Sequence, residues 1–401
     1  MWSIHGKKYD LSTFKNHPGG DQIIEMTKDI GDITAIFESY HAFSDKEKIM
    51  KILDKYSISD GISTISFKSY DELVNRVKEK FPDRKSIKST NILFYKVSVL
   101  IMLYIITYYI SLYSSYSLII KCICSFLAGA FKLSVSFNIL HDASHYAISV
   151  NPEINNILSK ISNSLILWNS NIWFYHHVYK HHSFTLMTDV DPDTLHFYPF
   201  FRKDKESKSK ANLLPTSKNP SLWAWFVLGV FPGFFLGQAI SYVFGYFKKN
   251  LWRIRLPKNI TYYTFFEICL MSFSLFNLYH GLFLQTFIYL LTANIFYHIN
   301  IFANHDTFET MENKYTGEDW LKTQICNSGN FINDNLIWTH LFGGINYQIE
   351  HHLFPNMAHE HLITVAPIVK QFCLERNIPY VHHTLTSAYL SFLKMLNANK
   401  T

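Results

Sequence analysis

Long apolar segments recur along most of the chain and predict a protein that spans a membrane. A helix needs about 20 apolar residues to cross a bilayer, and charges within such a segment are costly. One apolar segment, 222–247, is broken by Pro232 and several glycines, so we expect it to lie at the membrane without crossing it. Four other segments meet the length requirement and are predicted to span: 92–113, 118–140, 262–279 and 282–303.

The first 60 residues show a different pattern and predict a small folded domain. Apolar and polar residues alternate at 2–5 and 8–11, which predicts short strands. Residues 21–26 and 33–40 predict short helices with one apolar face. Because so few residues can form only a limited core, we expect a cofactor to complete it.

Charge and composition separate this domain from the rest of the chain. Residues 1–60 carry 8 Lys and 10 Asp or Glu, a net charge of −2. Because the whole chain has a net charge of +6, the remaining residues together carry +8. Residues 61–90 are polar and predict a linker, with an amphipathic helix near 69–80, before a membrane domain at 91–401. Only 17% of all residues are charged, against about 25% in soluble proteins. The basic residues flank apolar segments, which favours a cytosolic membrane surface and no nucleic-acid partner.

Two histidines of the acidic domain have the pattern of a haem site. His17 begins a His-Pro-Gly-Gly turn, and His41 follows 24 residues later. Two axial imidazoles leave haem iron no open position, which suits electron transfer. The flanking Tyr9 and Phe37 complete a motif that resembles the cytochrome b5 domain. The resemblance implies haem b, with His17 and His41 as axial ligands.

Three further histidine clusters lie beside apolar segments. Residues at i and i+4 share a helix face, so His141 with His145, and His177 with His181, are each expected to point at one centre. Imidazole suits iron and survives oxidation, which thiolate ligands would not. Seven imidazoles are too many for one metal ion and indicate two; we interpret His176 as a neighbour of the site. The seven candidate ligands are His141, His145, His177, His181, His182, His351 and His352.

These clusters resemble the three histidine boxes of the membrane fatty-acyl desaturases. The most specific match is the segment from Asn346 to Pro355, which contains Gln348-Ile349-Glu350-His351-His352. Gln348, together with the cytochrome b5-like domain, narrows the resemblance to the front-end desaturases. Asp191-Pro192-Asp193, Asp319-Trp320, Gln324 and Asn330-Phe331 also match this family.

The resemblance implies a fold, a reaction and a location. The fold is an all-α multi-pass membrane body, with four spanning helices and interfacial helices, preceded by a small α+β haem domain. The reaction is an O2-dependent desaturation at two non-haem iron ions, which inserts a double bond between an existing one and the carboxyl end. The expected location is the endoplasmic reticulum membrane, with both termini in the cytosol; the absence of an apolar leader agrees with a cytosolic N-terminus.

The family also implies an eighth imidazole from the last membrane helix. His305 occupies that place, and it could instead cap the helix end. His298 lies seven residues earlier and is either a partner of the site or a polar residue packed within the bundle. Gln348 occupies a position where a histidine would provide another ligand. Because a neutral amide binds iron poorly, we expect Gln348 to orient a ligand or to act through a water molecule.

Several alternatives remain open at this point. The second box followed by Asp-Pro-Asp resembles delta-5 and delta-4 desaturases more than delta-6 or delta-8 enzymes. A sphingolipid long-chain-base desaturase or an acyl hydroxylase would share the boxes, whereas a membrane-anchored haem carrier would need only residues 1–60 and one span. The expected partners are a fatty-acyl substrate on coenzyme A or lipid, O2, membrane lipids and an NAD(P)H-cytochrome b5 reductase. Acidic Asp29, Asp32 and Glu38 are candidates for docking that reductase.

Overall fold

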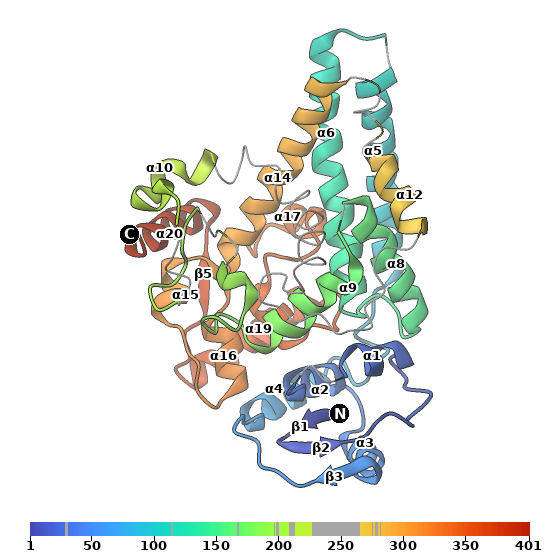
Figure 1. Cartoon of the computed structure of the whole chain (residues 1–401), viewed down its shortest axis with the longest axis vertical. Coiled ribbons are helices and arrows are strands. Elements are labelled where there is room, and N and C mark those ends of the chain that lie inside the picture. Colours follow the sequence, from blue (N-terminus) through green and yellow to red (C-terminus); the bar gives the residue numbers. More distant parts are fainter. Residues whose placement is uncertain are drawn as a thin grey trace.

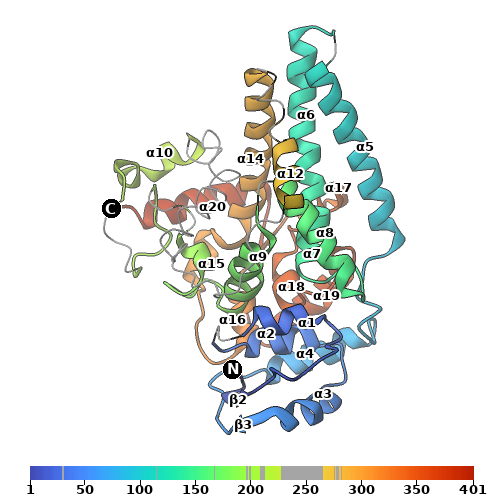
Figure 2. The same ribbon diagram turned by 45° about the vertical axis from the view of Figure 1, so that its right-hand side comes forward.

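The chain folds into a small α+β module and a larger helical body. Figures 1 and 2 show the module at one end of the molecule, while the long helices α5 (Asn91–Tyr113), α6 (Leu118–Ser136) and α14 (Phe283–His305) extend away from it. This arrangement confirms the predicted helical body preceded by a small α+β domain. The computed structural model describes residues 1–28, 31–113, 115–166, 168–195, 197, 200–207, 213–226, 265–274, 276, 280 and 282–401.

The N-terminal module confirms the predicted strands and helices. Strands β1 (Trp2–Ile4), β2 (Lys7–Tyr9) and β3 (Ser57–Ser59) form an antiparallel sheet in this order. His5 and Gly6 link the first two strands with φ values of 53° and 77°, which is the turn geometry that matches strand twist in a tight hairpin. Three helices cover the sheet: α1 (Asp21–Met26), α2 (Thr34–His41) and α3 (Lys46–Leu53).

In the described part of the body, the regular elements are helical apart from two short parallel strands. Two of its helical segments, Phe137–His141 and Phe174–His181, are π-helical. The other described elements are α4 (Lys68–Lys78), α7 (Asp142–Ser144), α8 (Pro152–Leu165), α9 (Ser170–Trp173), the 3-10 turns Pro192–Leu195 and Pro215–Lys218, α10 (Pro220–Trp225), α12 (Phe265–Ser274), α15 (Phe308–Glu312), α16 (Trp320–Cys326), β4 (Gly329–Phe331), α17 (Leu336–Leu341), α18 (Gln348–Leu353), α19 (His359–Glu375), β5 (Val381–His383) and α20 (Leu385–Ala398).

Three helical stretches of the described chain are long and apolar enough to cross a membrane. They are Asn91–Tyr113, Leu118–Ser144 and Phe283–Glu312, and they coincide with three of the four predicted spans. Only 22% of the most apolar window of the first is buried, so its apolar side chains suit contact with lipid. The fourth predicted span, 262–279, overlaps α12, but its remaining residues, like most of 222–247, lie largely outside the described residues.

The segment predicted as a linker is packed into the body. Its amphipathic helix α4 buries Tyr70, Leu73 and Val77 in a core that it shares with α16, α18 and α19. The Tyr70 hydroxyl donates a hydrogen bond to the Leu353 carbonyl at 2.8 Å. The apolar face that predicted the helix is therefore covered by the element that carries the third histidine box.

The module docks directly on the second histidine box. Phe174, Tyr175, Val178 and Tyr179 of the π-helical segment are buried in the same core as Trp2 and the other apolar residues of the module. The Tyr175 hydroxyl donates to the Met26 carbonyl, and the Tyr179 hydroxyl donates to the Asp32 carbonyl at 3.2 Å. Apolar packing and hydrogen bonds therefore fix the module next to the histidine cluster.

One residue of the expected reductase surface is not on the surface. Glu38 is only 5% exposed, and its carboxylate pairs with Lys46 Nζ at 2.5 Å and with His5 Nε2 at 2.7 Å. The prediction that Glu38 presents its charge to a partner is wrong, because its carboxylate is buried and paired with these two side chains. Asp32 is exposed, and Asp29 lies outside the described residues.

Two glycines bring the third box against the first. Gly343 and Gly344 precede α18 with φ values of 61° and 67°. A Cβ atom on Gly343 would lie 2.6 Å from the carbonyl oxygen of Phe137, at the start of the π-helical segment that ends in His141. Only glycine permits both this backbone conformation and this approach.

Replacing Gly343 with alanine should therefore destabilise the junction between the two boxes. A residue held in the left-handed region costs about 1–3 kcal/mol, and the clash with Phe137 adds to this. We expect a lower thermal unfolding midpoint in detergent and less bound non-haem iron. Gly317→Ala is the matched control, because its Cβ would meet the movable end of Tyr315. Equal midpoints for Gly343→Ala and the wild type would contradict this packing.

Candidate metal centre and haem site

The two histidines of the module face each other across a cavity. The Gly20 N–H donates to the His17 carbonyl at 2.8 Å and closes the predicted tight turn. His41 ends α2, where its Nδ1 donates to the Phe37 carbonyl at 2.7 Å and leaves Nε2 available. The two ring centroids lie 6.0 Å apart with an interplanar angle of 83°.

The cavity has the size and lining of a cofactor pocket. Its volume is about 440 Å³, within the usual range for ligand pockets. Burial and the neighbouring His41 lower the pKa of His17 to about 4, and burial also lowers the pKa of His41. Both imidazoles are therefore neutral at neutral pH, as metal ligation requires. Apolar side chains surround them: Ile4, Leu11, Phe14, Ile23, Ile24, Ile33, Ile36, Phe37, Ile49, Ile52 and Leu53.

The body closes one side of this cavity. Arg84, Lys88, Tyr146 and Asn356 line it together with the module. The Arg84 guanidinium also donates to the Pro18 and Val150 carbonyls at 3.1 Å, which ties the His-Pro-Gly-Gly turn to the body. The cavity between His17 and His41 is thus shared between the two parts of the chain, which the sequence did not indicate.

Seven of the eight predicted metal ligands form two buried groups, and the eighth lies beside both. No imidazole of the set is more than 7% exposed. His182 stacks on His352 with ring centroids 4.1 Å apart, and its ring lies 4.5 Å from that of His145. The first group is His141, His145, His177 and His351, and the second is His181, His305 and His352.

Imidazole nitrogens converge within each group. The Nε2 atoms of His141 and His177 lie 3.4 Å apart, and those of His181 and His305 lie 3.2 Å apart. Among the described residues, Nε2 of His145 and of His352 is buried without a hydrogen-bond partner. Such orphaned nitrogens are costly unless a further partner such as a metal ion binds them. The donor set therefore fits metal ions that accept nitrogen ligands.

Electrostatics keep most of these rings neutral. Burial lowers the pKa of His182, His351 and His352 well below the usual value, and the adjacent imidazoles lower it further. His181 differs: burial lowers its pKa, but the carboxylates of Asp191 and Asp193 outweigh this effect and raise it to about 8. Neutral rings offer lone pairs to a metal, and the carboxylates strengthen His181 as a ligand.

The π-helical geometry of the second box changes which of its histidines lie in the same group. The i, i+4 spacing predicted that His177 and His181 share one centre. The structure places them in different groups, although their rings stack at 5.4 Å. A π-helix has a wider turn than the α-helix on which that prediction rests, and such segments are frequent at functional sites. One segment therefore supplies ligand atoms to both groups.

Partners outside the groups hold several imidazoles through Nδ1. His305 donates to the Asn327 carbonyl at 2.8 Å, and His352 contacts Gln324 Oε1 at 2.9 Å. His181 contacts Asp191 at 3.1 Å. A partner on Nδ1 fixes the tautomer and directs Nε2 to a metal. The sequence match at Gln324 and Asp191 thus has a structural reason, whereas Asn327 was missed because it acts through its backbone.

The third box has its own support, and Gln348 lies within it. Asn330 and Tyr380 each donate to the Glu350 carboxylate at 2.8 Å, which holds α18 against β4. The amide nitrogen of Gln348 lies 3.0 Å from His305 Nε2. Gln348 therefore points at the space on which the imidazoles of the second group converge.

Two other histidines considered in the sequence lie outside both groups. His176 Nε2 contacts Asp193 at 2.6 Å, which agrees with its interpretation as a neighbour of the site. His298 donates from Nδ1 to the Asn294 carbonyl of its own helix at 2.9 Å and is in neither group.

Comparison with known proteins explains this constellation. The sequence model described as "Fatty acid desaturase" matches residues 117–384, which contain every imidazole of both groups. The chain belongs to this family. The model for the cytochrome b5-like haem/steroid-binding domain matches residues 1–60, which contain His17 and His41.

Curated relatives align over nearly the whole desaturase. An acyl-lipid (8-3)-desaturase of Mortierella alpina is 27% identical over 98% of this chain and 92% of its own length. A probable Delta(5) fatty acid desaturase C of Dictyostelium discoideum is 27% identical, covering 99% and 91%. A Delta(8)-fatty-acid desaturase 2 of Arabidopsis thaliana is 25% identical, covering 95% and 85%. The protein is thus a front-end fatty-acyl desaturase with a fused cytochrome b5 domain, and its cofactors include haem and iron.

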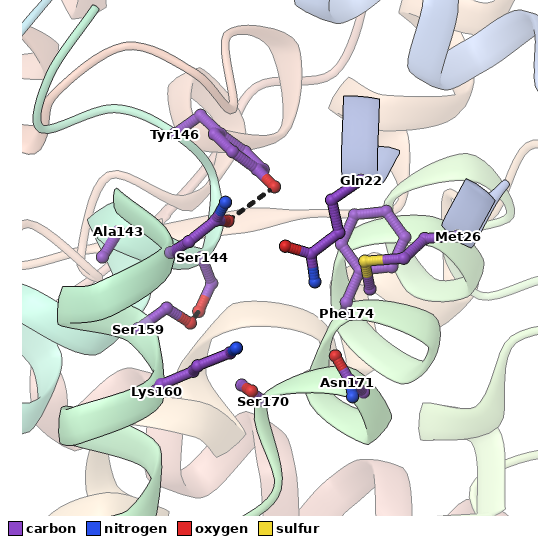
Figure 3. A pocket seen from close by; sticks show the side chains of 11 residues that line it. Gln22, Met26, Ala143, Ser144, Tyr146, Ser159, Lys160, Ser170, Asn171 and Phe174 are labelled. Carbon is purple, nitrogen blue, oxygen red and sulfur yellow. Dashed lines mark hydrogen bonds between the residues drawn. The ribbon is translucent and has the colours of Figure 1, made fainter. Parts of the chain in front are cut away.

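A small pocket lies where the two parts of the desaturase meet. Figure 3 shows Gln22 and Met26 of the module and Ser159 and Lys160 of the body pointing into it, beside the first box. Its volume of about 30 Å³ has room for one or two water molecules. This pocket is too small for an acyl chain, so the junction at this point is closely packed.

Proposed function

We propose that this desaturase inserts a double bond at carbon 5 of a polyunsaturated acyl chain that already has one at carbon 8. Two relatives with names of this type, one (8-3) and one Delta(5), support the position. The second histidine box followed by Asp191-Pro192-Asp193 favours a delta-5 or delta-4 enzyme over a delta-6 or delta-8 enzyme. The main support for the reaction is that two groups of imidazoles are buried together beside a module of the haem-binding type.

We assign one iron ion to each imidazole group. The first group supplies His141, His145, His177 and His351, and the second supplies His181, His305 and His352. His182 is the eighth ligand, because its ring contacts members of both groups. Gln348 acts beside the second group, through water or by orienting His305, since a neutral amide is a poor ligand for iron.

The chain contributes geometry, exclusion of water and electrons. When bound, the iron supplies the activation of O2 that breaking an unactivated C–H bond requires. The buried imidazoles keep water away from this chemistry, and their Nδ1 partners hold each ring in place. His17 and His41 hold haem b, which a separate NAD(P)H-cytochrome b5 reductase reduces one electron at a time. Regiochemistry then depends on where the acyl chain is held.

Yeast fed a panel of polyunsaturated fatty acids tests the reaction and its position. We expect cells that express the chain to form a new double bond at carbon 5, mapped by mass spectrometry of the total lipids. The matched control is His352→Ala, which should yield no product. A bond at carbon 8 or in a sphingoid base, or a hydroxylated chain, would contradict the proposal and identify which other member of the family this enzyme resembles.

Loss of His305 tests its assignment as a ligand. Purified His305→Ala, corrected for haem iron, should hold clearly fewer than two non-haem irons per chain and make no product. If His305 only capped α14, its loss would cost about 1 kcal/mol and leave the iron bound. His298→Ala is the matched control, because it removes another buried imidazole from the same helix. Two irons and normal turnover in His305→Ala would exclude a ligand role.

We propose four crossings of the endoplasmic reticulum membrane, with both termini in the cytosol. Boxes two and three meet, so an even number of crossings separates residues 182 and 348. Because Phe283–Glu312 is one candidate span between them, a second is required, and we assign it to 262–279. Segment 222–247 then lies on the cytosolic side.

Glycosylation reporters placed near residues 215 and 250 should both remain unmodified. The native acceptor sequence Asn259-Ile260-Thr261 should also be unmodified, for the same reason. A reporter near 116, between the first two spans, is the positive control and should be glycosylated. Modification near 250 but not near 215 would show that segment 222–247 crosses.

A further inference from the structure

One residue of the module reaches from the haem cavity to the metal groups. Tyr40 precedes His41 at the end of α2 and lines the same cavity. Its hydroxyl lies 2.8 Å from His145 Nδ1, and the two rings stack with an interplanar angle of 23°. The side chain of Tyr40 therefore lines the cavity beside His41 and also contacts an imidazole of the first group.

The hydrogen bond of Tyr40 involves Nδ1 of His145, the ring nitrogen that stays free when a metal binds Nε2. His145 belongs to the first group, and its Nε2 has no hydrogen-bond partner among the described residues. If Nε2 binds the metal, Nδ1 keeps its proton and donates it to the Tyr40 hydroxyl. In that case Tyr40 supports a metal ligand from outside, and this partner comes from the cytochrome b5-like module.

The body fixes Tyr40 in this position. The side-chain amide of Asn356 donates to the Tyr40 carbonyl at 2.9 Å. Lys88 Nζ donates to the main-chain carbonyl of Asn356 at 2.8 Å, which fixes the backbone from which this amide extends. Asn356 follows the third box closely in the chain. Hydrogen bonds at both ends of Tyr40 therefore tie the end of α2 to the metal-binding part of the body.

We propose that Tyr40 is the residue that carries electronic coupling from the haem site to the metal centre, through its hydrogen bond to His145. This inference rests on the proposed assignment of His41 as a haem ligand and His145 as an iron ligand. Tyr40 is not oxidised in this scheme: its ring and hydroxyl provide a continuous packed and hydrogen-bonded connection. Tyr40 is a positioning residue, because it acts through His145.

The electron balance defines what passes along this connection. Each transfer takes one electron from ferrous haem, which becomes ferric, and gives it to a ferric ion of the centre, which becomes ferrous. Two such electrons and two protons, with the two hydrogens removed from the acyl chain, reduce one O2 to two water molecules. The reductase that the proposed function requires restores the ferrous haem.

Haem reoxidation in Tyr40→Phe tests the proposal. Holoenzyme in lipid nanodiscs is reduced by NADH and cytochrome b5 reductase and then mixed with acyl substrate and O2. Haem absorbance is followed by stopped flow. We expect reoxidation to slow roughly 10- to 100-fold, the usual effect of losing an outer hydrogen bond to a metal ligand. The rate at which the reductase reduces the haem should stay the same, since the substitution removes only the hydrogen bond to His145 on the side of the metal groups.

Tyr175→Phe is the matched control for loss of docking. Its hydroxyl also bridges the two parts, to the Met26 carbonyl, but it does not contact an imidazole of the two groups through that bond. We expect this variant to reoxidise its haem at close to the wild-type rate. Equal slowing in Tyr175→Phe and Tyr40→Phe would overturn the proposal in favour of simple docking.

Four further outcomes are decisive. A wild-type rate in Tyr40→Phe would overturn the proposal, and so would a loss of bound haem or non-haem iron, which would give Tyr40 a structural role. Tyr40→Leu, which removes the ring as well, should reoxidise no faster than Tyr40→Phe. If removal of non-haem iron from the wild type leaves its reoxidation rate unchanged, the electron route of the proposed function fails independently of Tyr40.

Discussion

The burial of many neutral imidazoles at one point is the constraint on which the rest of this structure depends. Their rings lie within contact of one another and almost out of reach of water. If several were protonated, like charges would be forced together in a region of low dielectric. Burial and mutual proximity keep most of the rings neutral, and their converging nitrogens then need a cation. Metal binding and folding of this region are therefore coupled.

The surrounding architecture serves this requirement. The imidazoles of the two groups come from the ends of two candidate membrane helices, from a π-helical segment and from α18, so elements far apart in sequence must meet. Gly343 permits the approach of the third box to the first, and Asp191, Asn327 and Gln324 each hold an imidazole by Nδ1. The cytochrome b5-like module is part of the same arrangement, because it packs on the second box and Tyr40 reaches His145.

Much of this site could be predicted from the sequence because its signals are local. The His17 turn, the spacing to His41 and the three boxes each fall within a few residues or match a known motif. The wrong or missing parts depend on tertiary structure. The separation of His177 from His181 requires a π-helix, which an α-helical period does not reveal. The contact between Tyr40 and His145 joins residues 105 positions apart, and the burial of Glu38 depends on its pairing with Lys46.

The central claim is that the imidazoles form two metal sites beside one haem. Iron and haem quantified in the same purified wild-type sample test this claim most directly. Two groups of ligands predict two non-haem irons for each haem, and therefore three irons per chain. Brief treatment with a chelator should remove the non-haem iron without changing the bis-histidine haem spectrum. One non-haem iron per haem in fully loaded, active enzyme would contradict the two-site account.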